Sequence, residues 1–139
     1  MTIDDLYDIA EDESVEIDLF SLNQREALSM MDEDGKCYIA IDPKKVVSSA
    51  DEKTKLAHEL GHCVTGSFYN AYSPLDSRQR HENQADKWAI KRLIPKDDFE
   101  EAVADGYTEI WELAEFFNVT GEFMCKVISW YKFGNLYSL

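Results

Sequence analysis

The run His58-Glu59-Leu60-Gly61-His62 guides the interpretation of the rest of the chain. Positions i and i+4 of an α-helix share one face, so His58 and His62 can direct ring nitrogens toward a single metal ion. Glu59 lies one step around the helix and can hold a water beside the same ion. The run therefore predicts a helix that offers two metal ligands and a general base. Two core histidines flanking Gly61 would give the same five residues, so the motif needs a third ligand from elsewhere.

Length and charge bound the classes of protein that the chain can represent. It has 139 residues, 45% of them hydrophobic, which predicts a single domain over residues 1–139 with a core of its own. The 14 basic and 28 acidic residues give a net charge of −14. Such a surface repels phosphate backbones, so we expect no direct nucleic-acid binding and a basic protein as the better partner. An acidic surface that only keeps the protein in solution explains the same count.

The N-terminus and the cysteines bear on the cellular compartment. Residues 1–5 lack the basic-then-apolar order of a signal peptide, and no apolar run reaches membrane-spanning length. Cys37, Cys63 and Cys125 are odd in number and show no pairing pattern. We therefore expect a cytoplasmic protein with three free thiols and no membrane partner.

Hydrophobic periodicity and turn residues divide the chain into short elements. Gly35 is expected to take positive φ in a hairpin, the mostly apolar residues 38–41 to form a central strand, and Ser49 with Glu52 to open a helix as a capping box. The expected fold is α+β, with a small antiparallel sheet of about three strands packed with several helices. The expected elements are a helix from Thr2 or Asp4 to about Asp12, strands at 15–19, 26–31 and 36–42, and helices at 49–66, 77–93, 97–104, 110–117 and 122–131.

The next metal-capable residues after His62 are His81 and Glu82. Adjacent helical positions point about 100° apart, so only one of the two faces inward. Glu82 shares a stripe with Ala85 and Ala89, where a bare carboxylate is costly unless it is paired or metal-bound. His81 belongs to a more polar flank. We predict Glu82 as the third ligand, although a solvated helix face would explain the same acidic residues.

The predicted site then has three zinc ligands, His58, His62 and Glu82, with Glu59 as the catalytic base. Hydrolytic zinc sites have three protein ligands and keep one position for water, so we expect Zn²⁺ as the cofactor. Asp86, one turn after Glu82, could accept a hydrogen bond from a histidine ring and fix its tautomer.

These residues resemble the ImmA/IrrE family of zinc-dependent metallo-endopeptidases, which phages, integrative elements and bacterial chromosomes carry. The resemblance lies in residues 55–62, Lys-Leu-Ala-His-Glu-Leu-Gly-His, and in residues 81–95, which run from His-Glu through Ala-Asp to Leu-Ile-Pro. It is specific from about Gly35 to Pro95, and Trp88 stands where the family more often has Phe.

The resemblance implies a zincin-like metalloprotease core in which His58, His62 and Glu82 bind zinc and Glu59 acts as the base. Family members cleave a helix-turn-helix repressor encoded nearby and so relieve transcriptional repression. The resemblance therefore implies a DNA-binding repressor as the protein substrate.

The helix pair at about residues 108–133 is expected to belong to the same domain. Residues 110–131 resemble a helix-turn-helix register, but Lys126 is the one basic residue where a DNA-reading helix needs several. A packing pair that binds the partner or completes the cleft is the preferred interpretation.

Two points stay open at the level of sequence. Tyr69, Tyr72 and His81 are all candidates to stabilise the oxyanion of a hydrolytic reaction. The alternative function is a regulatory or antitoxin-like binding module, whose zinc site is vestigial or is closed by a fourth ligand such as His81 or Cys63.

Overall fold

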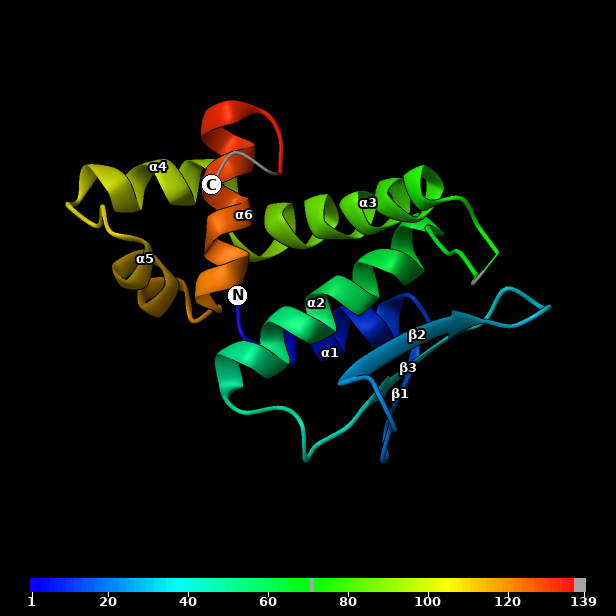
Figure 1. The fold of residues 1–139 in the computed structure, drawn as a ribbon. Helices are drawn as coiled ribbons and strands as arrows, with labels where there is room; N and C mark the ends of the chain where they lie inside the picture. The colour runs from blue at the N-terminus through cyan, green and yellow to red at the C-terminus, as the bar shows by residue number, and fades with distance from the viewer. Residues whose placement is uncertain (71, 137–139) are drawn as a thin grey trace.

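A computed structural model describes residues 1–70 and 72–136 of the chain. Figure 1 shows the three-stranded sheet at one end of the molecule, α2 and α3 in the middle, and α4, α5 and α6 at the other end. The elements are α1 (Ile3–Asp12), β1 (Glu16–Leu19), β2 (Ala27–Met31), β3 (Cys37–Ile41), α2 (Ser49–Thr65), α3 (Leu75–Leu93), α4 (Lys96–Ala104), α5 (Ile110–Phe117) and α6 (Gly121–Phe133). The α+β class predicted from the sequence is confirmed.

The sheet is mixed, which corrects the expectation of an antiparallel one. The strand order is β1-β3-β2, and β2 pairs antiparallel with β3 through a turn in which Gly35 has φ +85°. β1 pairs parallel with β3, with Ile17 opposite Ile39. Alternating side chains show which face of a strand is buried but not the direction of its neighbour, so the pattern at residues 15–19 could not reveal this pairing. β3 is central and largely buried, as its apolar sequence predicts.

Helix α2 begins at Ser49 as expected, but its N-cap lies one residue earlier than the capping pattern predicts. Ser48, not Ser49, is the N-cap, and its side chain accepts a hydrogen bond from the backbone N–H of Asp51. Gly66 ends the helix in the left-handed region, with φ +66°. Helices α3 and α4 begin two residues and one residue earlier than expected, with Pro74 and Pro95 at their N-cap positions, whereas α5 begins at Ile110 as expected.

Helices α2 and α3 cross very closely at Gly61. A Cβ atom at that position would lie 2.6 Å from the carbonyl oxygen of Ala85 and 2.9 Å from its Cα. The absent side chain of Gly61 and the small one of Ala85 thus allow the two backbones to touch. This crossing holds the two halves of the predicted site together.

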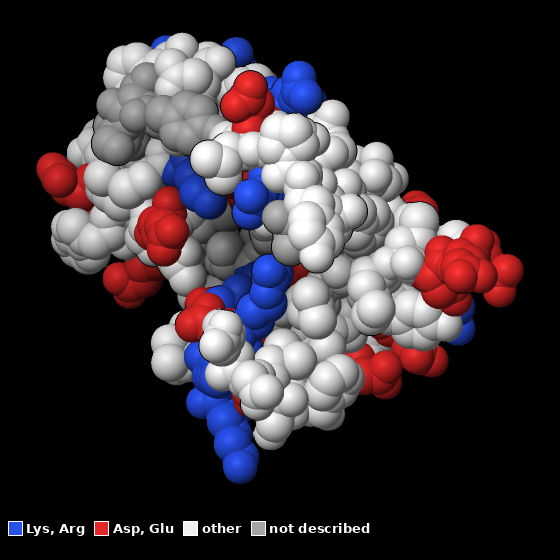
Figure 2. Space-filling view, turned by 45° about the vertical axis from the view of Figure 1, so that its right-hand side comes forward, with Lys and Arg blue, Asp and Glu red and all other residues white. Residues whose placement is uncertain are grey.

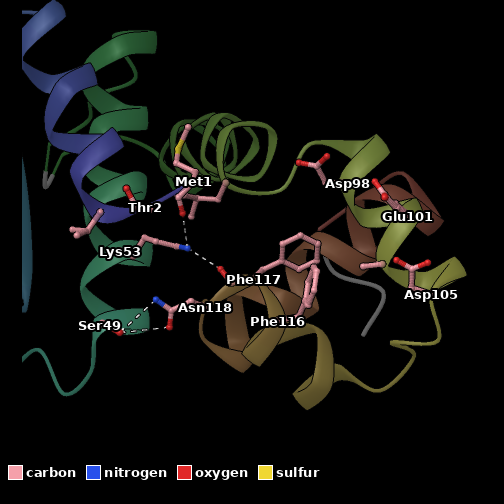
Figure 3. A pocket seen from close by; sticks show the side chains of 13 residues that line it. Met1, Thr2, Ser49, Lys53, Asp98, Glu101, Asp105, Phe116, Phe117 and Asn118 are labelled. Carbon is pink, nitrogen blue, oxygen red and sulfur yellow. Dashed lines mark hydrogen bonds between the residues drawn. The ribbon is translucent and has the colours of Figure 1, made fainter.

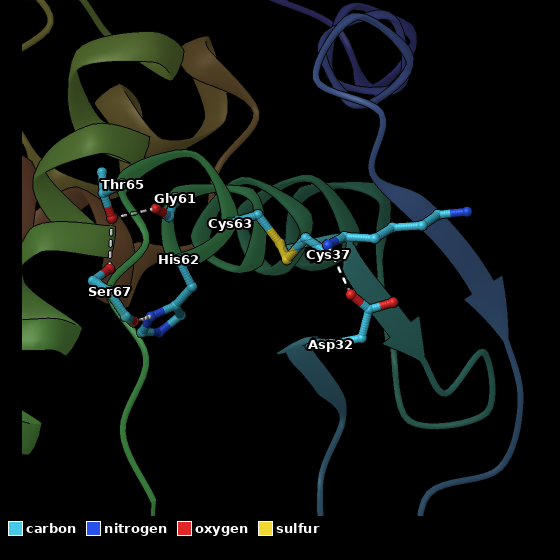
Figure 4. Close-up of a disulfide and its surroundings, with 8 residues drawn as sticks. Asp32, Cys37, Gly61, His62, Cys63, Thr65 and Ser67 are labelled. Carbon is cyan, nitrogen blue, oxygen red and sulfur yellow. Dashed lines mark hydrogen bonds between the residues drawn. A yellow bond between two sulfur atoms is a disulfide. The ribbon is translucent and has the colours of Figure 1, made fainter. Parts of the chain in front are cut away.

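A disulfide joins Cys37 on β3 to Cys63 on α2, so the expectation of three free thiols is wrong (Figure 4). The two Cα atoms are 5.9 Å apart, although the residues are separated by 26 positions in the sequence. The pairing arises because α2 packs on the sheet, a contact that cysteine spacing alone does not show. Cys125 is a free cysteine and is partly buried.

One hydrophobic core extends from the sheet to the C-terminal helices. Leu6, Ile39, Leu56, Ile90 and Met124 belong to the same buried cluster, so α6 shares its core with α1, β3, α2 and α3. Among the described helices, none combines the length and apolar character needed to cross a membrane.

Candidate metal centre

Three electron-pair donors converge where α2 crosses α3. His58 Nε2 lies 2.7 Å from Glu82 Oε2, His62 Nε2 lies 3.2 Å from the same oxygen, and the two Nε2 atoms are 3.2 Å apart. This is the one group of three or more His, Cys, Asp or Glu side chains with metal-ligand spacing among residues 1–70 and 72–136. The structure thus brings together the three residues predicted as ligands.

The crossing geometry explains why the three predicted ligands and Asp86 come together. His58 and His62 lie at −3 and +1 relative to Gly61, and Glu82 and Asp86 lie at −3 and +1 relative to Ala85. Residues at these offsets flank the contact point on the facing surfaces of the two helices.

Each histidine has its ring orientation fixed by an acceptor at Nδ1. His62 Nδ1 donates to the backbone carbonyl of Ser67, just beyond the end of α2 (Figure 4). His58 Nδ1 is 2.8 Å from Asp86 Oδ1, so Asp86 contacts His58, one of the two histidines that the sequence left open as its partner. A carbonyl oxygen can only accept, and the buried Asp86 carboxylate acts in the same way. Both rings therefore carry a proton on Nδ1 and direct Nε2 into the cluster.

This donor set fits a tetrahedral metal ion. Zinc–ligand bonds of about 2.0–2.1 Å place neighbouring ligand atoms about 3.3 Å apart. Two of the observed separations are 3.2 Å, and the third, between His58 and Glu82, is shorter at 2.7 Å. Two ring nitrogens and a carboxylate oxygen that converge on one point repel one another unless a cation, a proton or a metal ion, lies between them. Two imidazoles and one carboxylate are also a usual ligand set of catalytic zinc.

The pKa values at the centre reflect the same convergence. Burial lowers the pKa of His58, but hydrogen bonds to Asp86 and Glu82 outweigh burial and raise it to about 10. Burial raises the pKa of Glu82, whereas hydrogen bonds with His58, His62 and Tyr69 hold it well below its usual range. Glu82 is therefore ionised, and a metal ion bound by these atoms would displace the proton shared with His58.

Of the three candidate oxyanion donors, Tyr69 is the one that contacts the centre. Its hydroxyl donates to Glu82 Oε1 at 2.6 Å. That hydrogen bond, followed by burial, raises the pKa of Tyr69 to about 12, so the phenol keeps its proton. His81 stacks on Tyr69 with ring centroids 6.3 Å apart, and its buried Nδ1 has no hydrogen-bond partner among the described residues. Tyr72 is 96% exposed.

A cleft of about 690 Å³ opens over the centre, within the size range of substrate pockets. Glu59 lines it together with His58 and Glu82. The segment before β2 and the start of α6 form parts of its walls, so α6, the second helix of the C-terminal pair, contributes to the cleft. Four basic residues line the cleft of this acidic protein, and Figure 2 shows Lys and Arg side chains around a hollow. They are Arg25, Lys45, Lys55 and Lys126.

Two further contacts of the centre were not predicted from the sequence. Lys126 Nζ lies 3.1 Å from Asp86 Oδ2, so one carboxylate contacts both His58 and α6. The other contact is the carbonyl of Ser67, whose side chain plays no part in it. Every residue has a backbone carbonyl, so the sequence does not indicate which one accepts this hydrogen bond. The i, i+40 spacing of the Asp86–Lys126 pair has no local pattern either.

The comparison with known families agrees with this geometry. Residues 13–129 match the family model of the IrrE N-terminal-like domain, a peptidase family. The match covers more than half of the chain and confirms the resemblance seen in residues 55–62 and 81–95. No curated protein matches the chain at a significant level.

Proposed function

Because the chain belongs to the IrrE N-terminal-like domain family, a family of metallopeptidase type, we propose that it is a zinc-dependent endopeptidase. In this proposal His58, His62 and Glu82 bind Zn²⁺ and Glu59 is the general base. The observation that carries it is the convergence of three ligand atoms within hydrogen-bond distance of one another, beside Glu59 in an open cleft. Residues 1–139, with the helix pair at 108–133, are taken as one peptidase domain.

In the proposed hydrolysis of a peptide bond, each group around the centre has a separate role. A zinc ion held there would lower the pKa of a bound water and polarise the scissile carbonyl. Glu59 takes the proton of that water and passes it to the leaving amine. Asp86 and the Ser67 carbonyl keep both histidines in the tautomer that presents Nε2.

Tyr69 is the proposed oxyanion donor. Its hydroxyl is held at the centre by Glu82 and stays protonated, so it can turn from Glu82 Oε1 toward a developing negative charge. The same hydrogen bond orients Glu82 in the resting arrangement.

The proposed substrate is a helix-turn-helix repressor, cleaved to relieve repression in the cytoplasm. Two arguments support it: the resemblance to the ImmA/IrrE family, and a net charge of −14 that attracts basic proteins. The same charge disfavours direct binding of this chain to nucleic acid.

A closed structural zinc site in a binding module is the second candidate, and the donor set disfavours it. A closed site needs a fourth protein ligand. Cys63 is bonded to Cys37, and His81 lies outside the cluster that the described residues form. A centre with three donors and an adjoining cleft instead has the arrangement of a catalytic site.

Glu59→Gln tests the peptidase proposal. The variant keeps the size of the side chain and leaves the three ligands untouched, so we expect wild-type zinc content and loss of cleavage of the neighbouring repressor on co-expression. Glu52→Gln, two turns earlier on α2 and outside the cleft, is the matched control and should cleave normally. Cleavage by Glu59→Gln at the wild-type rate would overturn the mechanism.

A further inference from the structure

A second cavity lies away from the metal centre. It measures about 620 Å³ and is enclosed by the start of α1, one side of α2, and helices α4 and α5 (Figure 3). None of the residues that line it lines the metal cleft. The proposed peptidase chemistry makes no use of this cavity.

One wall of the cavity carries three carboxylates. Asp98 and Glu101 lie on α4 and Asp105 is its C-cap residue, and their i, i+3 and i+7 spacing places them on one face of the helix. None of them has an ion-pair partner among the described residues, whereas Glu100 on the same helix pairs with Lys96. Carboxylates that share one helix face give this wall a negative potential, which attracts a cation.

The lysine of this cavity does not neutralise them. Lys53 is only 4% exposed, and its ammonium donates to the carbonyls of Met1 at 3.0 Å and Phe117 at 2.7 Å. These bonds hold α2, the N-terminus and the end of α5 together, as the dashed lines in Figure 3 show. The ammonium is thus directed at backbone carbonyls, and the wall formed by α4 keeps its negative charge.

The other wall is aromatic. Phe116 is 53% exposed and stands edge-to-face against Phe117, with ring centroids 4.9 Å apart. An exposed ring beside carboxylates suits the guanidinium of arginine or the ammonium of lysine, because the charge pairs with the acids and the stem packs on the ring. Nucleic acid and anionic membranes are repelled by the same carboxylates.

We propose that this cavity is an exosite that binds an arginine- or lysine-bearing segment of the protein substrate. The argument is charge complementarity: three unpaired acids and an exposed aromatic ring select a basic, partly apolar segment of the kind found in DNA-binding proteins. That the segment belongs to the substrate rests on the proposed function, whereas binding of such a segment does not.

Peptide binding to the Glu59→Gln protein tests the exosite. The probe is a fluorescent octapeptide of alternating arginine and leucine, and its partner probe replaces each arginine by citrulline, which keeps the shape and removes the charge. We expect Asp98→Asn/Glu101→Gln/Asp105→Asn to weaken binding of the arginine peptide at least tenfold and to leave the citrulline peptide unaffected. Phe116→Ala should weaken binding of the arginine peptide several-fold.

The control removes three charges elsewhere. Asp18→Asn/Glu33→Gln/Asp34→Asn likewise removes three negative charges, on β1 and in the β2–β3 turn, at the opposite end of the molecule from α4 (Figure 1). Unchanged binding by this control supports a defined site. Equal weakening by both triple variants, or wild-type binding by the α4 variant, would overturn the proposal.

The test also separates the exosite from the peptidase. If the protein binds the arginine peptide through α4 but cleaves no repressor, the proposed function fails and the exosite stands. If the α4 variant binds normally while Glu59→Gln alone abolishes cleavage, the exosite fails and the peptidase stands.

Discussion

At the scale of single residues, Asp86 connects the two halves of the centre. One oxygen accepts from His58 Nδ1 at 2.8 Å and the other lies 3.1 Å from Lys126 Nζ. Asp86→Asn removes the negative charge that orients the His58 ring, so we expect zinc affinity to fall about 10- to 100-fold in competition with a chelator. Asp97→Asn, on the exposed surface of α4, should bind zinc normally. Wild-type affinity in Asp86→Asn would show that Asp86 does not support the ligand.

Tyr69→Phe separates the role of a hydroxyl from that of a ring. The variant loses the donor to Glu82 but keeps the aromatic contact with His81. If Tyr69 stabilises the oxyanion, kcat falls on the order of 100-fold while KM and zinc content stay near wild type. Tyr72→Phe, in the same loop but exposed, should leave kcat unchanged. A rise in KM alone would assign Tyr69 to substrate binding.

The sequence predicts which side chains come together where the phase of one helix decides it. The choice of Glu82 over His81 needed only the phase of a single helix, and the structure brings Glu82 into the cluster. The contact of Lys126 with Asp86 depends on how α6 packs against α3, which no local pattern describes. Such tertiary contacts are what sequence reasoning missed.

At the scale of elements, the crossing of α2 and α3 depends on one missing methyl group. Gly61→Ala would place a Cβ 2.6 Å from the Ala85 carbonyl, so the helices must separate. We expect unfolding free energy to fall by roughly 1–3 kcal/mol and zinc affinity to drop, because the histidines move away from Glu82. Urea unfolding and chelator competition measure the two effects.

Gly121→Ala is the matched control for that prediction. Gly121 is also helical, at the first turn of α6, but a Cβ there would meet nothing within 4 Å. Its substitution should leave stability unchanged or slightly raised, because alanine restricts the unfolded chain. Normal zinc binding by Gly61→Ala would mean that the centre tolerates a wider crossing.

Element boundaries and strand directions differ in how far local sequence determines them. The ends of α2, α5 and α6 follow from nearby caps and glycines and were predicted within about two residues. The parallel pairing of β1 with β3 depends on the path of residues 20–26 from one edge of the sheet to the other. That path is a property of the assembled sheet.

At the scale of the whole molecule, the Cys37–Cys63 disulfide links the sheet to the helix that carries the metal ligands. It closes a loop of 26 residues, for which the loss of unfolded-chain entropy is worth about 3–4 kcal/mol. We expect Cys37→Ala/Cys63→Ala to shift the midpoint of urea unfolding to clearly lower concentration. A reducing agent should shift the midpoint of the wild type in the same way and should not shift that of the double variant further.

Cys125→Ala, which removes the free cysteine, should match the wild type in both conditions. A wild-type midpoint that does not respond to the reducing agent would mean that the two thiols are unpaired in solution, and that core packing around β3 and α2 is sufficient to hold the ligand helix in place.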